Sequence, residues 1–223
     1  MKPLPVALLV VAKAPVAGLA KTRLAAAVGA EAAADIAAAA LLDTLDAVVA
    51  APVSARVVAM TGDLDEARAG DEIRERLQAF TVVPQRGGDF ADRLANAHID
   101  AADAAGGMPV LQIGMDTPQV TAELLTRCAE ALLGAPAVLG MAADGGWWVL
   151  GVRSARTADA LRGVPMSRGD TGALTFAALA SRGIGVTLVD ELRDVDTVDD
   201  VAPVRRAGAA DSRFARVTRT VGV

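Results

Sequence analysis

Short apolar runs alternate with longer helix-forming segments along most of this chain, and this alternation restricts the fold more than any other feature. Runs of strand length cover residues 4–12, 56–60, 80–84, 109–114, 137–141, 147–152 and 185–189. Helix-forming sequence lies between them, at residues 22–50, 63–78, 90–105, 122–133 and 172–181. Strands that alternate with helices predict an α/β fold: a Rossmann-like, doubly wound, mostly parallel sheet with helices on both faces. Residues 143–146 are too few for a parallel crossover, so the runs on either side of them are expected to pair antiparallel.

A chain of 223 residues is long enough for one domain with a sizeable core. We expect that domain to cover residues 1–204, because no repeat or shift in composition marks a second one. The remaining residues, 205–223, are expected to form a basic, solvated and partly disordered tail. Its charges are Arg205, Arg206, Arg213, Arg216 and Arg219 against Asp211.

Composition excludes several classes of function. The net charge of −5 argues against a nucleic-acid partner. One cysteine, Cys128, and one histidine, His98, cannot form a zinc cluster, a disulfide framework or a His-based catalytic triad. We expect His98 to lie at the surface or partly buried on a helix. No run reaches the roughly 20 apolar residues that span a bilayer, and the apolar residues 4–12 are followed at once by Lys13, so a cytoplasmic protein is expected.

The central predicted strand ends in a carboxylate. Val110, Leu111 and Ile113 form a buried run, Gly114 permits a close approach of the backbone, and Asp116 follows. Ligands of open α/β sheets bind at the carboxyl ends of the strands. Asp116 is therefore either a cap or Asx-turn before the helix near residue 121, or a ligand for a divalent metal that carries a phosphate.

The loop after the first predicted strand is basic, with Lys13, Lys21 and Arg23 in an otherwise acidic protein. Backbone N–H groups and a helix N-terminus favour an anion at such a place, so we interpret this loop as a phosphate site. The alternative is a basic loop that balances nearby acids. It is not a P-loop, because the two required glycines fall at Pro15 and Ala20.

A second glycine-rich segment precedes the helix at residues 90–105. Gly87 and Gly88 would let a base or ribose approach the backbone, and Asp89 follows them. A plain turn in which Asp89 caps the helix is equally consistent with these residues.

Asp144 stands before Gly145 and Gly146, between two apolar runs. The residues are typical of a hairpin turn, and they also fit an acid held on a rigid turn beside Trp147 and Trp148. Because side chains alternate along a strand, one tryptophan would line a pocket while the other fills the core, or both would only pack.

Two further aspartates, Asp194 and Asp196, share one face of an extended segment. Thr197 and the acids at 199–200 fit a helix start, which does not explain the earlier pair. Mg²⁺ is usually held by one or two carboxylates together with substrate phosphates, and Asp116 with Asp196 would supply them if the fold brings the two together.

Five blocks of sequence, in this order, resemble a bacterial glycosyltransferase-like family. The blocks are residues 12–24, 85–93, 113–118, 144–148 and 194–197. That family has the GT-A, nucleotide-diphospho-sugar transferase fold and is related to 2-phospholactate guanylyltransferase and to the molybdenum-cofactor nucleotidyltransferases. The resemblance covers residues 4–202. Met115 departs from it, since the family usually has Thr or Ser there, and a full Asp-x-Asp motif is missing.

The resemblance implies a role for each block. Lys13, Lys21 and Arg23 would hold phosphates, with the nucleotide over the first half of the sheet near Gly88 and Asp89. Asp116 and Asp196 would hold Mg²⁺ or Mn²⁺. Asp144 would lie on the acceptor side, with Trp147 and Trp148.

Three functions fit these residues. The first is a metal-assisted glycosyltransferase that uses a nucleotide-diphospho-sugar, with Asp116 and Asp144 as catalytic residues. The second is a nucleotidyltransferase that uses a nucleoside triphosphate, and the third is a protein that binds nucleotides without catalysis. Few basic residues lie near Asp144, which favours the first. The expected partners are a nucleotide-activated donor and an acceptor, with a homodimer as an open option.

Overall fold

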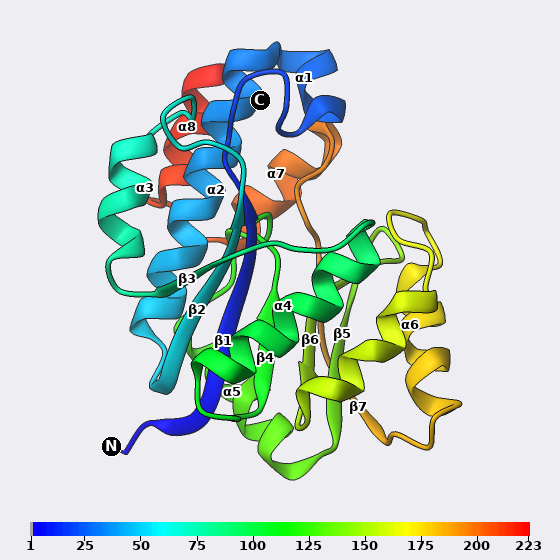
Figure 1. Ribbon diagram of the computed structural model, residues 1–223. Helices are drawn as coiled ribbons and strands as arrows, with labels where there is room; N and C mark the ends of the chain where they lie inside the picture. Colours follow the sequence, from blue (N-terminus) through cyan, green and yellow to red (C-terminus); the bar gives the residue numbers. More distant parts are fainter. Residues whose placement is uncertain (1) are drawn as a thin grey trace.

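The computed structural model describes residues 2–223, and seven strands form one mixed sheet through the middle of it (Figure 1). The strands follow one another in the spatial order β3-β2-β1-β4-β6-β5-β7. Their bounds are β1 Leu4–Lys13, β2 Val53–Thr61, β3 Thr81–Pro84, β4 Val110–Ile113, β5 Ala137–Ala142, β6 Trp147–Val152 and β7 Val186–Leu192. The predicted doubly wound, mostly parallel sheet is confirmed.

Only β6 runs against its neighbours. It pairs antiparallel with both β4 and β5, as expected from the short turn between β5 and β6. The pairs β1–β2, β1–β4, β2–β3 and β5–β7 are parallel. The carboxyl ends of β1, β4, β5 and β7 therefore meet at one edge of the sheet, where ligands of α/β proteins bind.

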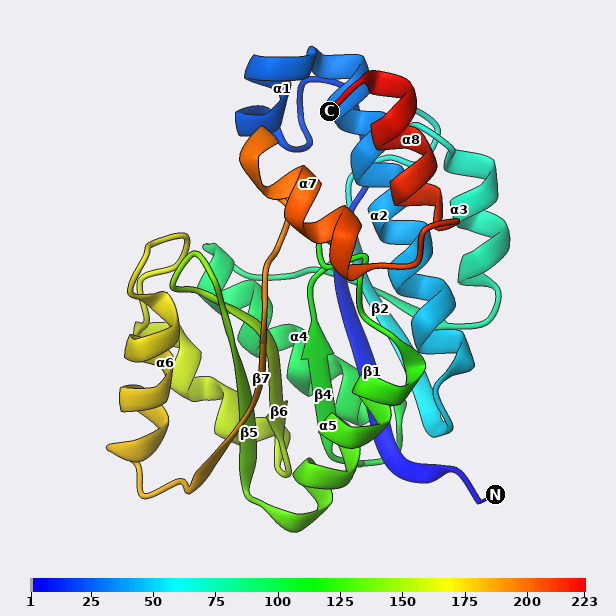
Figure 2. The same cartoon turned by 180° about the vertical axis from the view of Figure 1, so that it is seen from behind.

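Helices cover both faces of the sheet, as Figures 1 and 2 show from opposite sides. On one face, α4 (Phe90–Ala104), the 3-10 helix η1 (Ala155–Gly163) and α6 (Thr171–Ala180) enclose a core with Leu9, Val11 and Leu150. On the other face, α2 (Ala30–Ala50) and α5 (Ala122–Gly134) pack over Leu8, Val10 and Ile113, and α3 (Gly70–Leu77) lies beside α2. The short α1 (Thr22–Val28) leads from the basic loop into α2.

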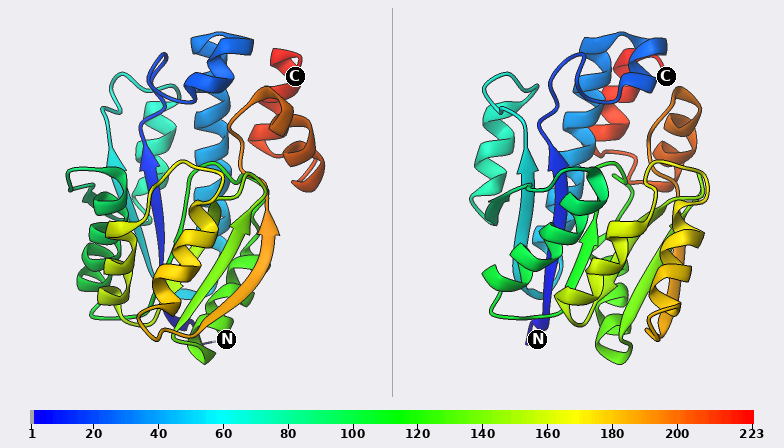
Figure 3. Two further views of the ribbon diagram at one scale, coloured as in Figure 1. Left: turned by 90° about the vertical axis from the view of Figure 1, so that its right-hand side faces the viewer. Right: turned by 45° about the vertical axis from the view of Figure 1, so that its right-hand side comes forward.

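The end of the chain is not the solvated tail that its arginines predict. Residues 198–207 form α7 (Val198–Ala207) and residues 213–221 form α8 (Arg213–Val221), which packs on the outer side of α2 (Figures 2 and 3). Phe214 is 2% exposed in a third core cluster with Leu24 and Ile36. Arg213 pairs with acids of α2 and α3, among them Asp46, so this arginine ties α8 to the fold.

Two other local expectations are wrong. His98 is fully buried on α4, because the helix turns this side of its surface toward the core. Residues 63–69 are turns and bends, and helix α3 begins only at Gly70. Among residues 2–223, no helix combines the length and the apolar character needed to cross a membrane.

Candidate active site

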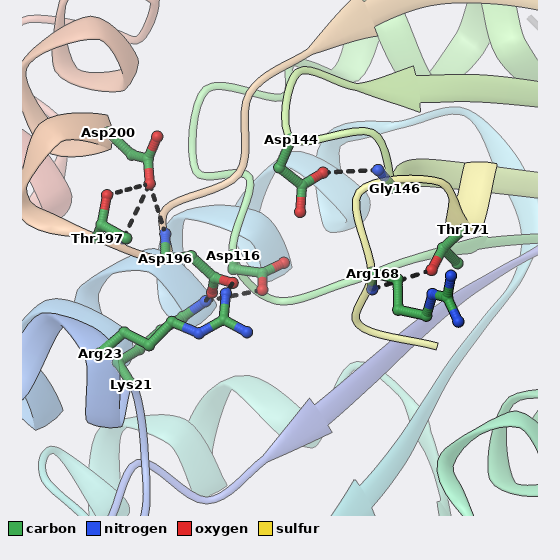
Figure 4. Close-up of polar contacts among 10 residues, drawn as sticks. All are labelled: Lys21, Arg23, Asp116, Asp144, Gly146, Arg168, Thr171, Asp196, Thr197 and Asp200. Atoms are coloured by element: carbon green, nitrogen blue, oxygen red, sulfur yellow. Dashed lines mark hydrogen bonds and ion pairs between the residues drawn. The ribbon is translucent and has the colours of Figure 1, made fainter. Parts of the chain in front are cut away.

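Segments that follow β1, β4 and β7 meet at the carboxyl edge of the sheet. The backbone N–H of Val195, beyond β7, donates to the carbonyl of Asp116, beyond β4, over 2.9 Å. The N–H of Ala143, between β5 and β6, donates to the carbonyl of Leu192. These two bonds fix loops that are far apart in the sequence against one another, and they carry Asp116, Asp144, Asp194 and Asp196 into one region. Figure 4 shows three of them, Asp116, Asp144 and Asp196.

Three of these aspartates form a cluster. One carboxylate oxygen from each of Asp116, Asp194 and Asp196 lies within 4.8 Å of the others. The sequence predicted Asp116 and Asp196 as the pair, and the structure does bring them together. It adds Asp194, which lies two positions before Asp196 on the extended segment after β7. All three are partly exposed, so the cluster opens to solvent and not into the core.

The ammonium of Lys21 bridges two members of the cluster. Its Nζ lies 2.8 Å from Asp116 Oδ2 and 2.8 Å from Asp196 Oδ1, and the side chain is 12% exposed. Burial alone would lower the pKa of Lys21, but the two carboxylates outweigh burial and raise that pKa above its ordinary value. Arg23 Nη1 adds a contact of 3.3 Å to Asp196 Oδ2. A fixed cation is thus held at the place predicted for a metal.

The backbone of Lys21 is left-handed, with φ 48° and ψ 49°. Non-glycine residues rarely adopt this conformation, and where they do it often marks a functional site. Ser167, whose φ is 59°, borders the same region from the opposite side. Lys13, the other lysine of the loop, makes no ion pair with the cluster: its Nζ donates to the carbonyl of Leu19 over 2.9 Å.

Asp194 is the member of the cluster with the most perturbed titration. Burial first, and then the negative charges of Asp116, Asp144 and Asp196, raise its pKa to about 7. The amino group of Lys21 bonds to the other two carboxylates and not to this one. Asp194 is therefore poised to gain or lose a proton near neutral pH, or to release it when a cation binds.

Asp144 faces the cluster from the turn between β5 and β6 (Figure 4). Its Oδ1 accepts the N–H of Gly146 over 2.7 Å, so the expected turn chemistry is present. Gly145 has φ +89°, and a Cβ there would overlap the carbonyl oxygen of Gly169. The N–H of Gly172 donates to the Gly145 carbonyl over 2.8 Å, which ties this turn to the start of α6.

A cavity of about 530 Å³ lies beside these residues and reaches under α4. Lys13, Arg23, Asp116, Asp144 and the pair after β7 line its charged side. Trp147 borders it and is half-buried. Trp148 also borders it, but its side chain is 2% exposed in the core and its indole N–H donates to the Asp190 carbonyl, so one tryptophan mainly fills the core.

The second glycine-rich segment contributes through other residues than expected. Within residues 2–223, the cavity wall includes Gln85, Phe90 and Arg93 but neither Gly88 nor Asp89. Asp89 caps α4, since its carboxylate accepts the N–H of Asp92 over 2.8 Å. The expected helix start after β7 is also present, with the Asp200 carboxylate accepting from the N–H of Thr197. Thr121, not Asp116, caps α5, which leaves the Asp116 carboxylate available to the site.

The chain belongs to the DUF2064 family, which is described as uncharacterized protein conserved in bacteria. The family model matches residues 44–168, more than half of the chain. No curated protein matches the sequence of this chain.

Solved structures give the same fold. One from Desulfovibrio desulfuricans G20, named provisionally as a nucleotide-diphospho-sugar transferase, is 25% identical with a TM-score of 0.84, over 97% of this chain and 94% of its own. The nucleotidyl transferase Mth528 from Methanothermobacter is 20% identical with a TM-score of 0.55, over 96% and 98%. Rv0371c from Mycobacterium tuberculosis H37Rv, in complex with manganese, is 20% identical with a TM-score of 0.54, over 90% and 97%. The GT-A-like fold is therefore shown, and the first two of these neighbours are named as transferases, one of each kind.

Proposed function

We propose that this protein is a metal-assisted transferase that takes a group from a nucleotide-activated donor, and that it is a glycosyltransferase acting from a nucleotide-diphospho-sugar. The observation that carries the proposal is the cluster of Asp116, Asp194 and Asp196 at the ligand-binding edge of the sheet, in which Asp116 and Asp196 pair with the ammonium of Lys21. Carboxylates grouped in this way around a cation, with Arg23 beside them, are suited to a diphosphate and its counter-ion.

The donor set fits Mg²⁺ or Mn²⁺. Both prefer oxygen ligands, and Asp116 and Asp196 already hold a positive charge between them in the form of the Lys21 ammonium. Asp116, Asp194 and Asp196 would hold the metal. When bound there, the metal would neutralise charge that develops on the leaving diphosphate. Lys21, displaced from the carboxylates, would reach the phosphates together with Arg23 and Lys13.

Transfer of a glycosyl group needs an acceptor hydroxyl beside the sugar carbon, and we place that hydroxyl next to Asp144. In the proposed step the hydroxyl oxygen bonds to the sugar carbon, the bond from this carbon to the diphosphate oxygen breaks, and Asp144 receives the proton of the acceptor hydroxyl. The rigid turn at Gly145 and Gly146 supports this role, because it fixes where the Asp144 carboxylate points. The nucleoside diphosphate leaves with the electron pair of the broken bond.

Nucleotidyl transfer is the second candidate. It is supported by the similarity of fold to Mth528 and by Arg93 and Arg168 in the cavity wall, which would suit an acceptor that carries a phosphate. In that reaction the same residues would hold a triphosphate, and pyrophosphate would leave.

The test is a thermal-unfolding panel in Mn²⁺ that compares nucleotide-diphospho-sugars with nucleoside triphosphates for every base. A ligand at 100 times its Kd stabilises the native state by about 2.7 kcal/mol, which is roughly 5–10 °C for a chain of this size. A shift with one diphospho-sugar and none with triphosphates supports glycosyl transfer. A shift with one triphosphate alone moves the assignment to nucleotidyl transfer, and no shift with any of them refutes both.

Asp116→Ala then tests the metal role. We expect it to fold, to lose the Mn²⁺-dependent part of the shift and to lose turnover. Asp71→Ala is the matched control, because its carboxylate is fully exposed on α3, away from the site. Unchanged turnover in Asp116→Ala would exclude the metal role of this residue.

A further inference from the structure

Gln112 is a polar residue on the central strand of the sheet, where apolar residues are expected. It pairs in register with Leu9 of β1 and Leu150 of β6, and both of these belong to the core under α4. Its strand neighbours Leu111 and Ile113 point to the opposite face and pack in the core under α2 and α5. Gln112 therefore places an amide on the face of the sheet that α4 and η1 cover.

The carboxamide oxygen of Gln112 lacks a hydrogen-bond partner within residues 2–223. The side chain is 1% exposed, and its Oε1 accepts no hydrogen bond from residues 2–223. By contrast, the amide nitrogen of Gln85 donates to the carbonyls of Ala12 and Ala59. The amide nitrogen of Gln119 donates to the carbonyl of Arg193, but its Oε1, like that of Gln112, is buried without a partner. An unpaired buried amide lowers stability, because the group has lost water and gained nothing.

Gln112 lines the cavity of the candidate site, so a ligand bound in that cavity would supply the missing hydrogen-bond partner. Near it, the wall is apolar and is formed by Val11, Leu94, Trp147 and Met166. The charged residues of the same cavity lie at the strand ends, four positions further along the chain at Asp116. At about 3.3 Å per residue, a fully extended chain would place the Cα atoms of Gln112 and Asp116 at most about 13 Å apart, and β4 ends at Ile113, so the two lie within this distance.

We infer that Gln112 is a specificity-determining residue that hydrogen-bonds a hydroxyl group of an uncharged sugar ring, held in the apolar half of the cavity. A sugar ring offers hydroxyl groups on its rim and apolar C–H faces, which match one amide among Leu94, Trp147 and Met166. A charged group would lose its hydration there without an opposite charge to replace it. The inference rests on the proposed function, since it places the sugar beside the diphosphate site.

The ring has two sources of the same chemistry. In glycosyl transfer it is the sugar of the diphospho-sugar donor. In nucleotidyl transfer it is the sugar of a phosphorylated acceptor. Gln112 recognises the hydroxyl group in either case.

Stability of the ligand-free protein gives the first test. We expect Gln112→Leu to raise the midpoint of thermal unfolding by about 2–4 °C, because it removes an unpaired amide and keeps the volume. Gln85→Leu is the matched control, since it breaks two bonds to backbone carbonyls and should lower the midpoint. A lower midpoint in Gln112→Leu would assign the amide a structural role and overturn the inference.

Ligand binding gives the second test, with Mn²⁺ present throughout. The probes are UDP, GDP, their glucose, galactose, mannose and N-acetylglucosamine derivatives, and the corresponding sugar 1-phosphates. If the ring comes from the donor, a diphospho-sugar shifts the wild type further than its nucleoside diphosphate, and Gln112→Leu erases only that excess. If it comes from the acceptor, a sugar phosphate shifts the wild type and not the variant.

Two results overturn the inference: shifts from the sugar that persist in Gln112→Leu, and a wild type that no sugar ring shifts beyond its nucleotide or phosphate alone. Failure of the proposed function looks different. In that case neither UDP, GDP nor a triphosphate shifts the wild type, while the comparison of Gln112→Leu with Gln85→Leu still decides whether the Gln112 amide is kept at a cost in stability.

Discussion

Replacing Asp194 with asparagine should change how the stability of the protein depends on pH. Burial and three neighbouring carboxylates raise the pKa of Asp194 to about 7, against an ordinary value of 3.8. Between these two values the native state binds the proton and the unfolded state does not. The free energy of unfolding therefore falls as pH rises from about 4 to about 7, and asparagine, which resembles the protonated acid, removes this loss.

The size of the effect follows from the shift. Each pH unit in the window contributes up to about 1.4 kcal/mol, so three units give about 4 kcal/mol. Because Asp194 is partly exposed, solvent screening roughly halves this figure. We expect Asp194→Asn to match the wild type near pH 4 and to be more stable by about 2 kcal/mol at pH 8.

His98 acts in the opposite direction over much of the same range. Burial lowers its pKa from 6.5 to about 3, so the unfolded state binds the proton first and stability falls as pH drops below 6.5. In the wild type the two slopes partly cancel. In Asp194→Asn only the pH dependence due to His98 remains of these two. The free energy of unfolding then falls by about 1.4 kcal/mol for each pH unit below pH 6.5.

Urea unfolding between pH 4 and pH 8, with a chelator to remove divalent metals, measures these differences. Carboxylates that do not interact with Asp194 contribute equally to both proteins and drop out of the comparison. Asp190→Asn, whose carboxylate is 66% exposed, should run parallel to the wild type. A constant difference between Asp194→Asn and the wild type across the range would refute the assignment of a raised pKa to Asp194.

Three further predictions concern the docking of α8, the turn at Gly145 and the charge of the aspartate cluster. Phe214→Ala should lower the free energy of unfolding by about 3–5 kcal/mol in urea, against a small change for the exposed Phe176→Ala; a small loss for both would contradict the docking of α8. Gly145→Ala should cost about 1–3 kcal/mol and reduce turnover, while Gly163→Ala, with open space around it, should do neither. Lys21→Met should lower stability by about 1–3 kcal/mol in chelator and recover it in Mn²⁺, and a variant that Mn²⁺ leaves unchanged would exclude a cation site between the carboxylates.

The sheet could be predicted from the sequence because its signals are local. The buried run of β1, the antiparallel turn at Gly145 and the capped start of α7 each depend on residues within about ten positions. The placement of α8 depends on distant residues. Asp43 of α2 accepts the backbone N–H groups of Arg213 and Phe214, and nothing near residue 213 in the sequence indicates that partner.

The position of a site residue could be predicted from the sequence where it directly follows a predicted strand. It could be predicted less well where it depends on how a loop is placed. Asp116 follows a strand whose end defines the ligand edge, so its position could be read directly. Gln112 gave no such signal, because one polar residue in a short apolar run is consistent with an exposed edge or a bulge. Its significance depends on burial and on the lack of a partner, which only the folded chain defines.

The position of Asp194 follows from the order of the strands. Strand β7 is three places from β4 in the sheet, a distance of about 14 Å at 4.8 Å per strand. The three residues from the end of β7 at Leu192 to Val195 span at most about 11 Å, and the loop after β4 covers the rest of the distance. The chain after β7 must therefore be nearly extended to reach Asp116, where the Val195 N–H bonds to its carbonyl. In an extended chain alternate side chains point to opposite sides. With Val195 buried in the cluster of Leu24 and Phe214, Asp194 and Asp196 must both turn toward the site.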